Sequence, residues 1–298
     1  MSPKTYNFKK IDAFATAKSS GNPAGTVWLE EGDGIDTSGM LQLARELKGF
    51  VSEVGYIHKI EAGRYGLKFY SSEREVDFCG HATIAMMYEL FQSKELEALD
   101  QITIVTNYGE LTVENRIKTD DAVFVMAPPP VEKKNLPSLQ EIARSLRISL
   151  DDLDAAWPVN IINAGLNTLI VPIVSLESIL MISPDLAELN QFCVNQGIDI
   201  VEVFTEDVSM KAHDYRVRVF APTFGYLEDP ATGSGNSALG YYLLDKNSWQ
   251  KETLILEQNS HAENYNLIKL QKKEVEGRTR VIFGGGAIKR MEGEYTLY

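Results

Sequence analysis

At 298 residues the chain is long enough to bury a large core and to form two domains of ordinary size. Hydrophobic residues make up 44% and charged residues 24%, which is typical of a globular protein and excludes a disordered chain. The formal net charge of -13 opposes binding to nucleic acid and to anionic membranes, so we expect neither as a partner.

The N-terminal segment MSPKTYNFKKIDAF lacks the apolar stretch of a signal peptide, and no segment has the roughly eighteen apolar residues of a membrane span. We therefore expect a cytoplasmic protein. The two cysteines, Cys79 and Cys193, are too few for a disulfide framework. The four histidines are scattered without metal-ligand spacing, so no metal site is expected.

In chain order, the first half predicts a turn and strand at GNPAGTVWL (21–29), a helix at GMLQLARELKG (39–49) and strands at FVSEVGYIHKI (50–60) and YGLKFY (65–70). A small-residue turn, CGHA (79–82), then leads into the apolar helix TIAMMYELF (83–91). Strands follow at QITIVTNYGELTVE (101–114) and DAVFVMAPPP (121–130).

The second half repeats this order. GLNTLIVPI (165–173), SPDLAELNQFCVNQG (183–197), DIVEVFTED (199–207) and YRVRVF (215–220) match the first four elements, and TGSG (232–235) with ALGYYLL (238–244) matches the turn and apolar helix. Strand patterns at 252–271 and 278–287 complete the second unit. Between the halves, the proline run at 127–137 predicts a linker, and Ser138 with Glu141 predicts a capping box at the start of a connecting helix.

A helix that is apolar on every face must be buried on every face. The repeat therefore predicts an α+β fold with two pseudo-symmetric domains, each a barrel-like mixed or antiparallel sheet wrapped around one central apolar helix. Each central helix begins at a turn rich in Gly, Ser and Thr. Such a helix start can bind an anion through its backbone amides, or its polar side chains can simply cap the helix. Two such starts indicate a small carboxylate as substrate.

Glu53 is the most informative carboxylate. It lies in an apolar strand, where partial desolvation suits a carboxyl group to proton transfer. Counting from Tyr65 and Tyr215 places Val203 at the matching position of the second half, so the second half lacks this acid. An exposed strand position remains the alternative for Glu53.

His81 lies just inside the first helix start, where the helix dipole disfavours an imidazolium ion and a neutral imidazole is expected. Asp229 precedes the second helix start and either caps the helix or holds a substrate amine. Cys79 suggests a different function, that of a racemase. A pair of opposed thiols would serve a two-base racemase, but the matching residue is Thr232, whose hydroxyl is too weak an acid or base.

Four motifs, IDAF with GNPAG, SEVGYI, VDFCGHAT and EDPATGSG, occur in the order found in the PhzF-like phenazine-biosynthesis family, and the chain resembles that family over nearly its whole length. The resemblance implies the diaminopimelate-epimerase-like fold, with the site in the cleft between the two domains. It also implies a C-terminal strand that returns to the first domain. The predicted domains are then residues 1–129 with about 288–298, and residues 130–287.

The same resemblance implies the roles of individual residues. Glu53 would be the acid/base of a cofactor-independent isomerase that moves a proton within a small amino or hydroxy carboxylate, similar to a dihydro-hydroxyanthranilate. Substrate binding would fall to residues at the two helix starts: Gly80, His81, Asp229, Thr232, Gly233 and Ser234. A homodimer is also implied.

Two alternatives remain open at this point. One is an amino-acid racemase or epimerase that uses Cys79. The other is a binding protein that has kept the anion site and lost catalysis, against which Glu53 argues, because a pure binder has no need of an unpaired acid.

Overall fold

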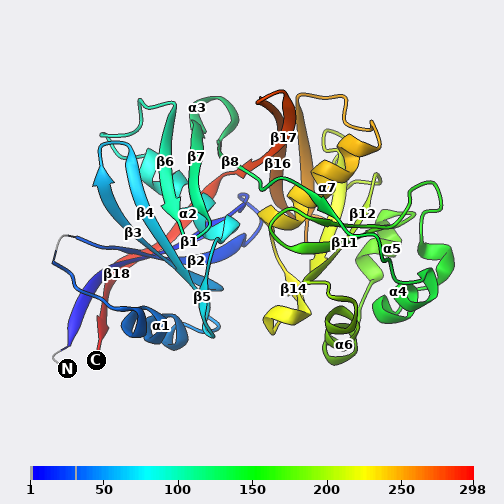
Figure 1. Cartoon of the computed structure of the whole chain (residues 1–298), viewed down its shortest axis with the longest axis horizontal. Coiled ribbons are helices and arrows are strands. Elements are labelled where there is room, and N and C mark those ends of the chain that lie inside the picture. The colour runs from blue at the N-terminus through cyan, green and yellow to red at the C-terminus, as the bar shows by residue number, and fades with distance from the viewer. Residues whose placement is uncertain (1–2, 31) are drawn as a thin grey trace. The chain divides into compact units, whose positions relative to one another are not determined.

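A computed structural model describes residues 3–30 and 32–298. Met1 and Ser2, at the beginning of the N-terminal segment considered above, lie outside the described residues. The chain divides into two compact units, Met1–Met126 with Gly284–Tyr298 and Ala127–Phe283 (Figure 1).

The first unit is a mixed sheet with a helix inside it. Its strands and helices are β1 (Lys4–Ala13), β2 (Asn22–Trp28), α1 (Thr37–Glu46), β3 (Glu53–Glu61), β4 (Arg64–Tyr70), β5 (Glu75–Val76), α2 (Gly80–Phe91), β6 (Gln101–Thr106), β7 (Gly109–Arg116), α3 (Ile117–Asp120), β8 (Ala122–Met126) and β18 (Ala287–Leu297). The strands pair in the order β18, β1, β2, β3, β4, β6, β7, β8, with β2–β3 and β4–β6 parallel and the other pairs antiparallel.

The second unit has the same plan. Its elements are β9 (Val131–Glu132), α4 (Leu139–Leu146), β10 (Asn160–Asn163), β11 (Asn167–Pro172), α5 (Leu176–Met181), α6 (Leu186–Gln196), β12 (Ile200–Thr205), β13 (Tyr215–Phe220), β14 (Glu228–Asp229), α7 (Gly233–Asp245), β15 (Thr253–Gln258) and β16 (Asn266–Val275). Short 3-10 helices lie at Leu150–Asp152 and Pro222–Phe224, and β17 (Arg278–Gly285) crosses the boundary between the units.

Strand directions confirm the predicted repeat. In the second unit, β11–β12 and β13–β15 are parallel, while β10–β11, β12–β13 and β15–β16 are antiparallel, which matches the order found in the first unit. The α+β fold with two pseudo-symmetric units is therefore confirmed.

The two apolar helices are central, as their sequences require. In the first unit α2 packs against β1, β2, β3, β8 and β18, and in the second α7 packs against β10, β11, β12 and β16 (Figure 1). Residues 81–87 of α2 and 235–243 of α7 are all buried, so neither helix has a solvent face over these turns. The amphipathic helices lie outside, where α1 covers one apolar cluster of the first unit and α4, α5 and α6 cover one of the second.

The capping box predicted at the connecting helix is present. The Ser138 hydroxyl accepts a hydrogen bond from the Glu141 amide, and the Glu141 carboxylate accepts one from the Ser138 amide. Within the described residues no helix is both long enough and apolar enough to cross a membrane.

Candidate active site

The two central helices begin with the same backbone geometry. Cys79, the N-cap of α2, has φ -127° and ψ 110°, and Thr232, the N-cap of α7, has φ -127° and ψ 114°. Neither side chain caps its own helix by a hydrogen bond. The capping interpretation of these turns therefore loses support, because an ordinary N-cap side chain would accept from an amide of the first turn. The first turn of α7 is free of that competitor for an anion, while in α2 the Ala82 backbone contacts the Cys79 sulfur.

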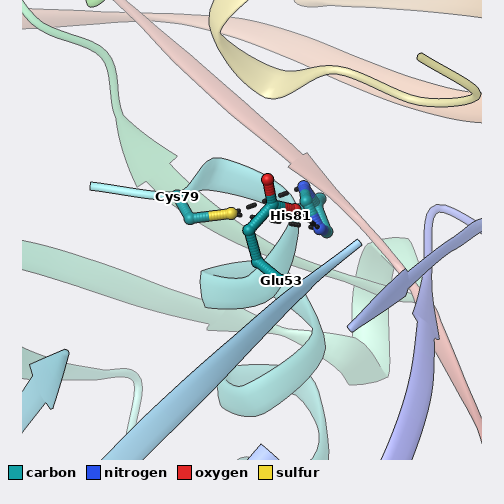
Figure 2. A group of neighbouring side chains, drawn as sticks. All are labelled: Glu53, Cys79 and His81. Carbon is teal, nitrogen blue, oxygen red and sulfur yellow. Dashed lines mark hydrogen bonds and ion pairs between the residues drawn. The ribbon is translucent and has the colours of Figure 1, made fainter. Parts of the chain in front are cut away.

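Glu53 lies beside the start of α2 (Figure 2). The strand β3 begins at Glu53, and the Oε2 atom of Glu53 is 3.1 Å from Nε2 of His81, the second residue of α2. Both side chains are largely buried, with exposed fractions of 10% for Glu53 and 9% for His81. The exposed-strand alternative for Glu53 is therefore wrong. Although the distance fits an ion pair, Oε2 makes no hydrogen bond of good geometry within the described residues.

Cys79 completes this cluster. Its Sγ atom lies 3.5 Å from Nδ1 and 3.9 Å from Nε2 of His81 (Figure 2). Similar distances to both ring nitrogens place the sulfur over the imidazole and not in line with either lone pair. One carboxylate oxygen, one imidazole nitrogen and one sulfur lie within 4.8 Å of one another.

The charges of this cluster differ from the sequence-based expectation. Burial lowers the pKa of His81, but the neighbouring Cys79 sulfur and Glu53 carboxyl group outweigh burial and raise this pKa well above its usual range. Burial raises the pKa of the Cys79 thiol, which keeps that thiol neutral near pH 7. Glu53, whose Oε2 is 3.1 Å from Nε2 of His81, is thus the acidic partner of His81, and its proximity opposes the helix dipole that predicted a neutral imidazole.

The start of α7 is built around the buried side chain of Gln258, in β15. The Gln258 carboxamide accepts hydrogen bonds from the Thr232 amide at 3.0 Å and from Nδ2 of Asn236 at 2.8 Å, and it donates to the Asp229 carbonyl at 2.9 Å. The Thr232 hydroxyl donates to the Asp229 carboxylate. Gln258 was missed in the sequence because nothing local links a strand glutamine to a turn about 25 residues before it.

Ser234 and Gly233 differ from these anchored residues. Within the described part of the chain, the half-buried Ser234 side chain makes no hydrogen bond, so its hydroxyl is available to a ligand. Gly233 lies against the ring of Phe283, since a Cβ atom at Gly233 would be 2.4 Å from Cε2 of that ring. The helix start can therefore take this position only with glycine.

The sheet ladders correct the matching of the two halves. In the first unit Val54 of β3 pairs with Tyr70, the last residue of β4, and Glu53 directly precedes Val54. In the second unit Val201 of β12 pairs with Phe220, the last residue of β13, and Ile200 directly precedes Val201. The counterpart of Glu53 is therefore Ile200, and the position Val203 obtained by counting is wrong. The error arises because Ile200 lies 15 positions before Tyr215, whereas Glu53 lies 12 positions before Tyr65: the loop after β12 is longer than the turn after β3, and β12 is shorter than β3.

Glu202 is a buried acid that sequence reasoning missed. It lies two residues beyond Ile200 on β12 and hence on the same face of the strand. Its side chain is fully buried, neither carboxyl oxygen has a hydrogen-bond partner among the described residues, and Oε2 would be 2.7 Å from a Cβ atom on Gly235. Burial alone raises the pKa of Glu202 well above its usual range. The second unit thus contains an acid behind α7, at a different register from Glu53.

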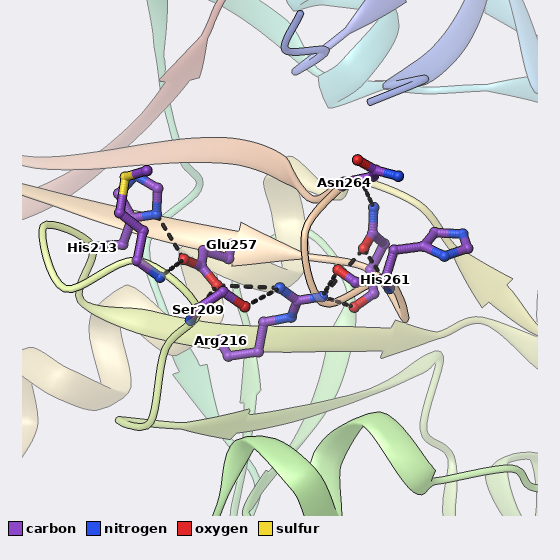
Figure 3. Close-up of polar contacts among 8 residues, drawn as sticks. Ser209, His213, Arg216, Glu257, His261 and Asn264 are labelled. Carbon is purple, nitrogen blue, oxygen red and sulfur yellow. Dashed lines mark hydrogen bonds and ion pairs between the residues drawn. The ribbon is translucent and has the colours of Figure 1, made fainter. Parts of the chain in front are cut away.

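A second buried charged cluster lies elsewhere in the second unit (Figure 3). The fully buried Glu257 accepts from Nη1 of Arg216 at 3.1 Å, from Nδ1 of His213 at 2.8 Å and from the amides of Ser209 and Met210. Arg216 also donates to the carbonyls of Asn259 and His261. Within the described residues only Nε of Arg216 in this cluster lacks a hydrogen-bond partner, and the other contacts tie two loops together, so we interpret the cluster as structural.

A groove on the first unit is also separate from Glu53. Its volume is about 950 Å³, and Trp28, Tyr65, Met86 and Tyr88 are among the residues that line it. None of the three residues of the Glu53 cluster lines this groove. We therefore base the candidate site on the chemistry of the helix starts and not on the volume of the groove.

Comparison with known proteins identifies the family. The sequence profile described as "Phenazine biosynthesis-like protein" (PhzC-PhzF) matches residues 11–293. The chain belongs to the PhzF family. An uncharacterized isomerase of Clostridium acetobutylicum is 31% identical to this PhzF-family chain over 249 residues, covering 81% of this chain and 80% of that protein. The uncharacterized isomerase YfhB of Bacillus subtilis is 28% identical and covers 94% of both.

Solved structures agree on the PhzF fold. A PhzF-family phenazine biosynthesis protein of Bacillus anthracis superposes with a TM-score of 0.87 at 24% identity, covering 98% of this chain and 99% of that one. A hydroxyproline epimerase of Agrobacterium vitis shares the fold more distantly, with a TM-score of 0.61 at 12% identity over 99% and 93% of the two chains. The predicted family, the epimerase-like fold and the isomerase class of enzyme are thereby confirmed.

Proposed function

We propose that this PhzF-family chain is a cofactor-independent isomerase in which Glu53 moves a proton within one small amino or hydroxy carboxylate. The observation that carries the proposal is the buried Glu53–His81 pair, with 3.1 Å between Oε2 and Nε2. A carboxylate held beside an imidazole in a partly dry site has the components of general acid/base catalysis.

The proton transfer is balanced without a further reactant. The Glu53 carboxylate takes a proton from an acidic carbon of the substrate, which becomes a carbanion delocalised toward the substrate's unsaturated system. The Glu53 carboxyl group then returns the proton to a different carbon of the same molecule. His81, whose pKa is raised, holds the positive charge that stabilises the anionic species on either side of the transfer.

Substrate binding is assigned to the helix starts. We assign the substrate carboxylate to the first turn of α7, where Gly233 brings the backbone close and the Ser234 hydroxyl has no hydrogen-bond partner in the described structure. Thr232 holds the Asp229 carboxylate in place, and this carboxylate is assigned to a substrate amine. Gly80 opens the corresponding turn at α2.

Replacement of Glu53 tests the proposal. The assay incubates a dihydro-hydroxyanthranilate and other small unsaturated amino carboxylates in D2O, and follows isomerisation and deuterium incorporation by NMR. We expect Glu53→Gln to lose turnover by at least about a hundredfold, the lower range for general acid/base catalysis, while it still binds the ligand. Glu61→Gln, at the exposed end of the same strand, is the matched control and should keep full activity. Unchanged turnover in Glu53→Gln refutes the assignment.

The second candidate is a cysteine-dependent epimerase, which the 3.5 Å distance between Cys79 Sγ and His81 Nδ1 favours. Against it, burial raises the pKa of Cys79, and the matching N-cap of the second unit is Thr232. The variant Cys79→Ala separates the two. Retained turnover rules out the thiol, whereas loss of turnover in Cys79→Ala with retention in Glu53→Gln establishes the epimerase chemistry.

A further inference from the structure

The Glu53–Cys79–His81 cluster combines three kinds of donor atom that transition metals prefer. Sγ of Cys79 is 3.5 Å and 3.9 Å from the two nitrogens of His81, and Oε2 of Glu53 is 3.1 Å from Nε2. A Zn²⁺ ion with bonds of about 2.0–2.3 Å to oxygen, nitrogen and sulfur holds its ligand atoms roughly 3.2–3.8 Å apart. The measured distances lie within about 0.1 Å of this range or inside it, and all three ligand atoms are within 4.8 Å of one another, so the cluster is close to the spacing of a three-ligand zinc site.

The burial of the cluster adds a second, independent observation. Oε2 of Glu53 is buried and makes no hydrogen bond within the described residues, although a buried carboxylate oxygen ordinarily accepts one. The sulfur of Cys79 and the ring of His81 are also buried, at 7% and 8% exposure of their residues. Oε2 lies 3.1 Å from Nε2 of His81 without a well-aligned hydrogen bond, and a cation placed among the three atoms would give this oxygen a direct partner.

We propose that this cluster binds one thiophilic divalent cation, with Zn²⁺ as the best match, through Cys79 Sγ, one imidazole nitrogen of His81 and one carboxylate oxygen of Glu53. Binding releases two protons to the solvent, one from the Cys79 thiol and one from the His81 imidazolium, and involves no change of oxidation state. Three protein ligands leave a fourth position to water, as in open zinc sites. A small rotation of the imidazole brings a nitrogen lone pair toward the ion.

The bound cation inhibits the enzyme. Glu53 cannot accept a substrate proton while its oxygen is coordinated, so bound zinc would stop the proton transfer. This consequence rests on the proposed function of Glu53, whereas the metal site itself does not.

The second unit provides an internal comparison. The positions that match Glu53, Cys79 and His81 are occupied by Ile200, Thr232 and Ser234. None of these side chains is a strong ligand for zinc. The chain should therefore bind one equivalent of metal at such a site and not two.

Titration of the purified chain with Co²⁺ tests the site without a substrate. We expect a near-ultraviolet charge-transfer band from a cobalt–thiolate bond and visible bands of four-coordinate cobalt, both saturating at one equivalent and both abolished by Zn²⁺. Cys79→Ser should lose the near-ultraviolet band. Cys193→Ser should keep it, because the other cysteine is buried in α6. Glu53→Gln and His81→Gln should weaken Co²⁺ binding by at least about tenfold.

The outcomes separate the two proposals. A near-ultraviolet band that survives in Cys79→Ser and in Cys79→Ala, both shown to be folded by circular dichroism, overturns the site, as does absence of the band in the wild-type chain. Zinc that binds at one equivalent without lowering wild-type turnover overturns the inhibition. If Glu53→Gln remains active while wild type shows the cobalt band, the proposed function fails and the metal site stands.

Discussion

Replacement of Glu202 by methionine is expected to stabilise the folded chain, and by an amount that increases with pH. Glu202 is fully buried between β12 and α7 and has no hydrogen-bond partner for either carboxyl oxygen among the described residues. Methionine has a similar length, contains no ionisable group and fills irregular spaces in a core. The substitution therefore removes an unsatisfied polar group without opening a large cavity.

The magnitude follows from the proton that Glu202 holds. In the unfolded chain a glutamate ionises near its ordinary pKa of 4.5, while burial raises the pKa of Glu202 in the folded chain well above that value. Between these two pKa values the folded state binds more protons than the unfolded state, so stability falls as pH rises. The loss is at most about 1.4 kcal/mol per pH unit, or roughly 3 kcal/mol between pH 4.5 and 7.

Urea unfolding at pH 5, 6, 7 and 8 measures this difference. Two of the three tryptophans, Trp157 and Trp249, lie in the second unit, and Trp157 packs on Phe204 of β12. In a Trp28→Phe background, tryptophan fluorescence therefore reports the unfolding of the unit that contains Glu202. We expect the gap in unfolding free energy between Glu202→Met and its parent to widen at each step above pH 5.

Glu257 is the matched control, because it is equally buried but fully paired. Burial raises the pKa of Glu257, but hydrogen bonds from His213, from two backbone amides and from Arg216 outweigh burial and lower it. Here the folded state binds fewer protons, so the stabilisation is present above about pH 4.5 and is lost as pH falls through the lowered pKa. Glu257→Met should cost about 3–5 kcal/mol at pH 7, because it leaves the buried Arg216 unpaired.

Opposite signs for these two buried glutamates are the decisive result. If Glu202→Met is less stable than its parent at every pH, or if the difference does not change from pH 5 to 8, the reasoning is refuted. Glu202 would then be an ionised group with a partner, and not a protonated acid isolated behind α7.

Two further predictions concern the helix starts. Gly233→Ala should destabilise the second unit by about 1–3 kcal/mol in urea, since the added Cβ would be 2.4 Å from the buried ring of Phe283. Gly293→Ala, where no atom lies within 4 Å of the added Cβ, should cost far less, and equal costs would contradict the packing argument. Cys79 should react slowly with iodoacetamide at pH 7.5 in the folded chain and rapidly in urea, because burial raises the pKa of its thiol. Mass spectrometry of the Cys79 peptide checks this, and complete labelling of the folded chain within minutes would show an accessible thiolate.

The repeat and the central helices could be predicted from sequence because they depend on local patterns. The helices α2 and α7 are apolar on every face, so burial on every face follows without knowledge of their neighbours. The capping box at Ser138 and Glu141 is similarly local, since its two partners are three residues apart. Even with low similarity between the halves, these local signals recur in the same order.

The details of the site depend on contacts that no local pattern records. Glu53 meets His81 because β3 and α2 pack together, although the two residues are 28 positions apart in sequence. Val203 was wrongly taken as the counterpart of Glu53, because counting residues assumes that the connections in the two halves have equal lengths. The pairing of neighbouring strands gives the correct counterpart whatever the length of the connection. Glu202 was overlooked because the strand DIVEVFTED gives no sign that both faces of β12 are buried.

The corrected register shows how chemistry is divided between the units. β5 and β14 pair with β4 and β13 in the same way, so Asp229 matches Val76, just as Ile200 matches Glu53. Glu53 and Asp229 thus each have an apolar counterpart in the other unit, whereas Glu228 matches another acid, Glu75. Two equivalent acids would favour a symmetric two-base exchange at one carbon, as in a racemase.

Unequal acids favour a different reaction. Glu53 has an imidazole 3.1 Å away and Oε2 without a hydrogen bond, whereas the Asp229 carboxylate accepts a hydrogen bond from Thr232. Only the first carboxylate is placed to receive a proton, and the second is suited to bind a substrate cation. The two units share one fold, but their acidic groups differ in position and partners. The proposal of a one-base isomerisation rests on this difference. An acid introduced at Ile200 should therefore not act as a second base. It would have no imidazole beside it, because the residue of the second unit that matches His81 is Ser234.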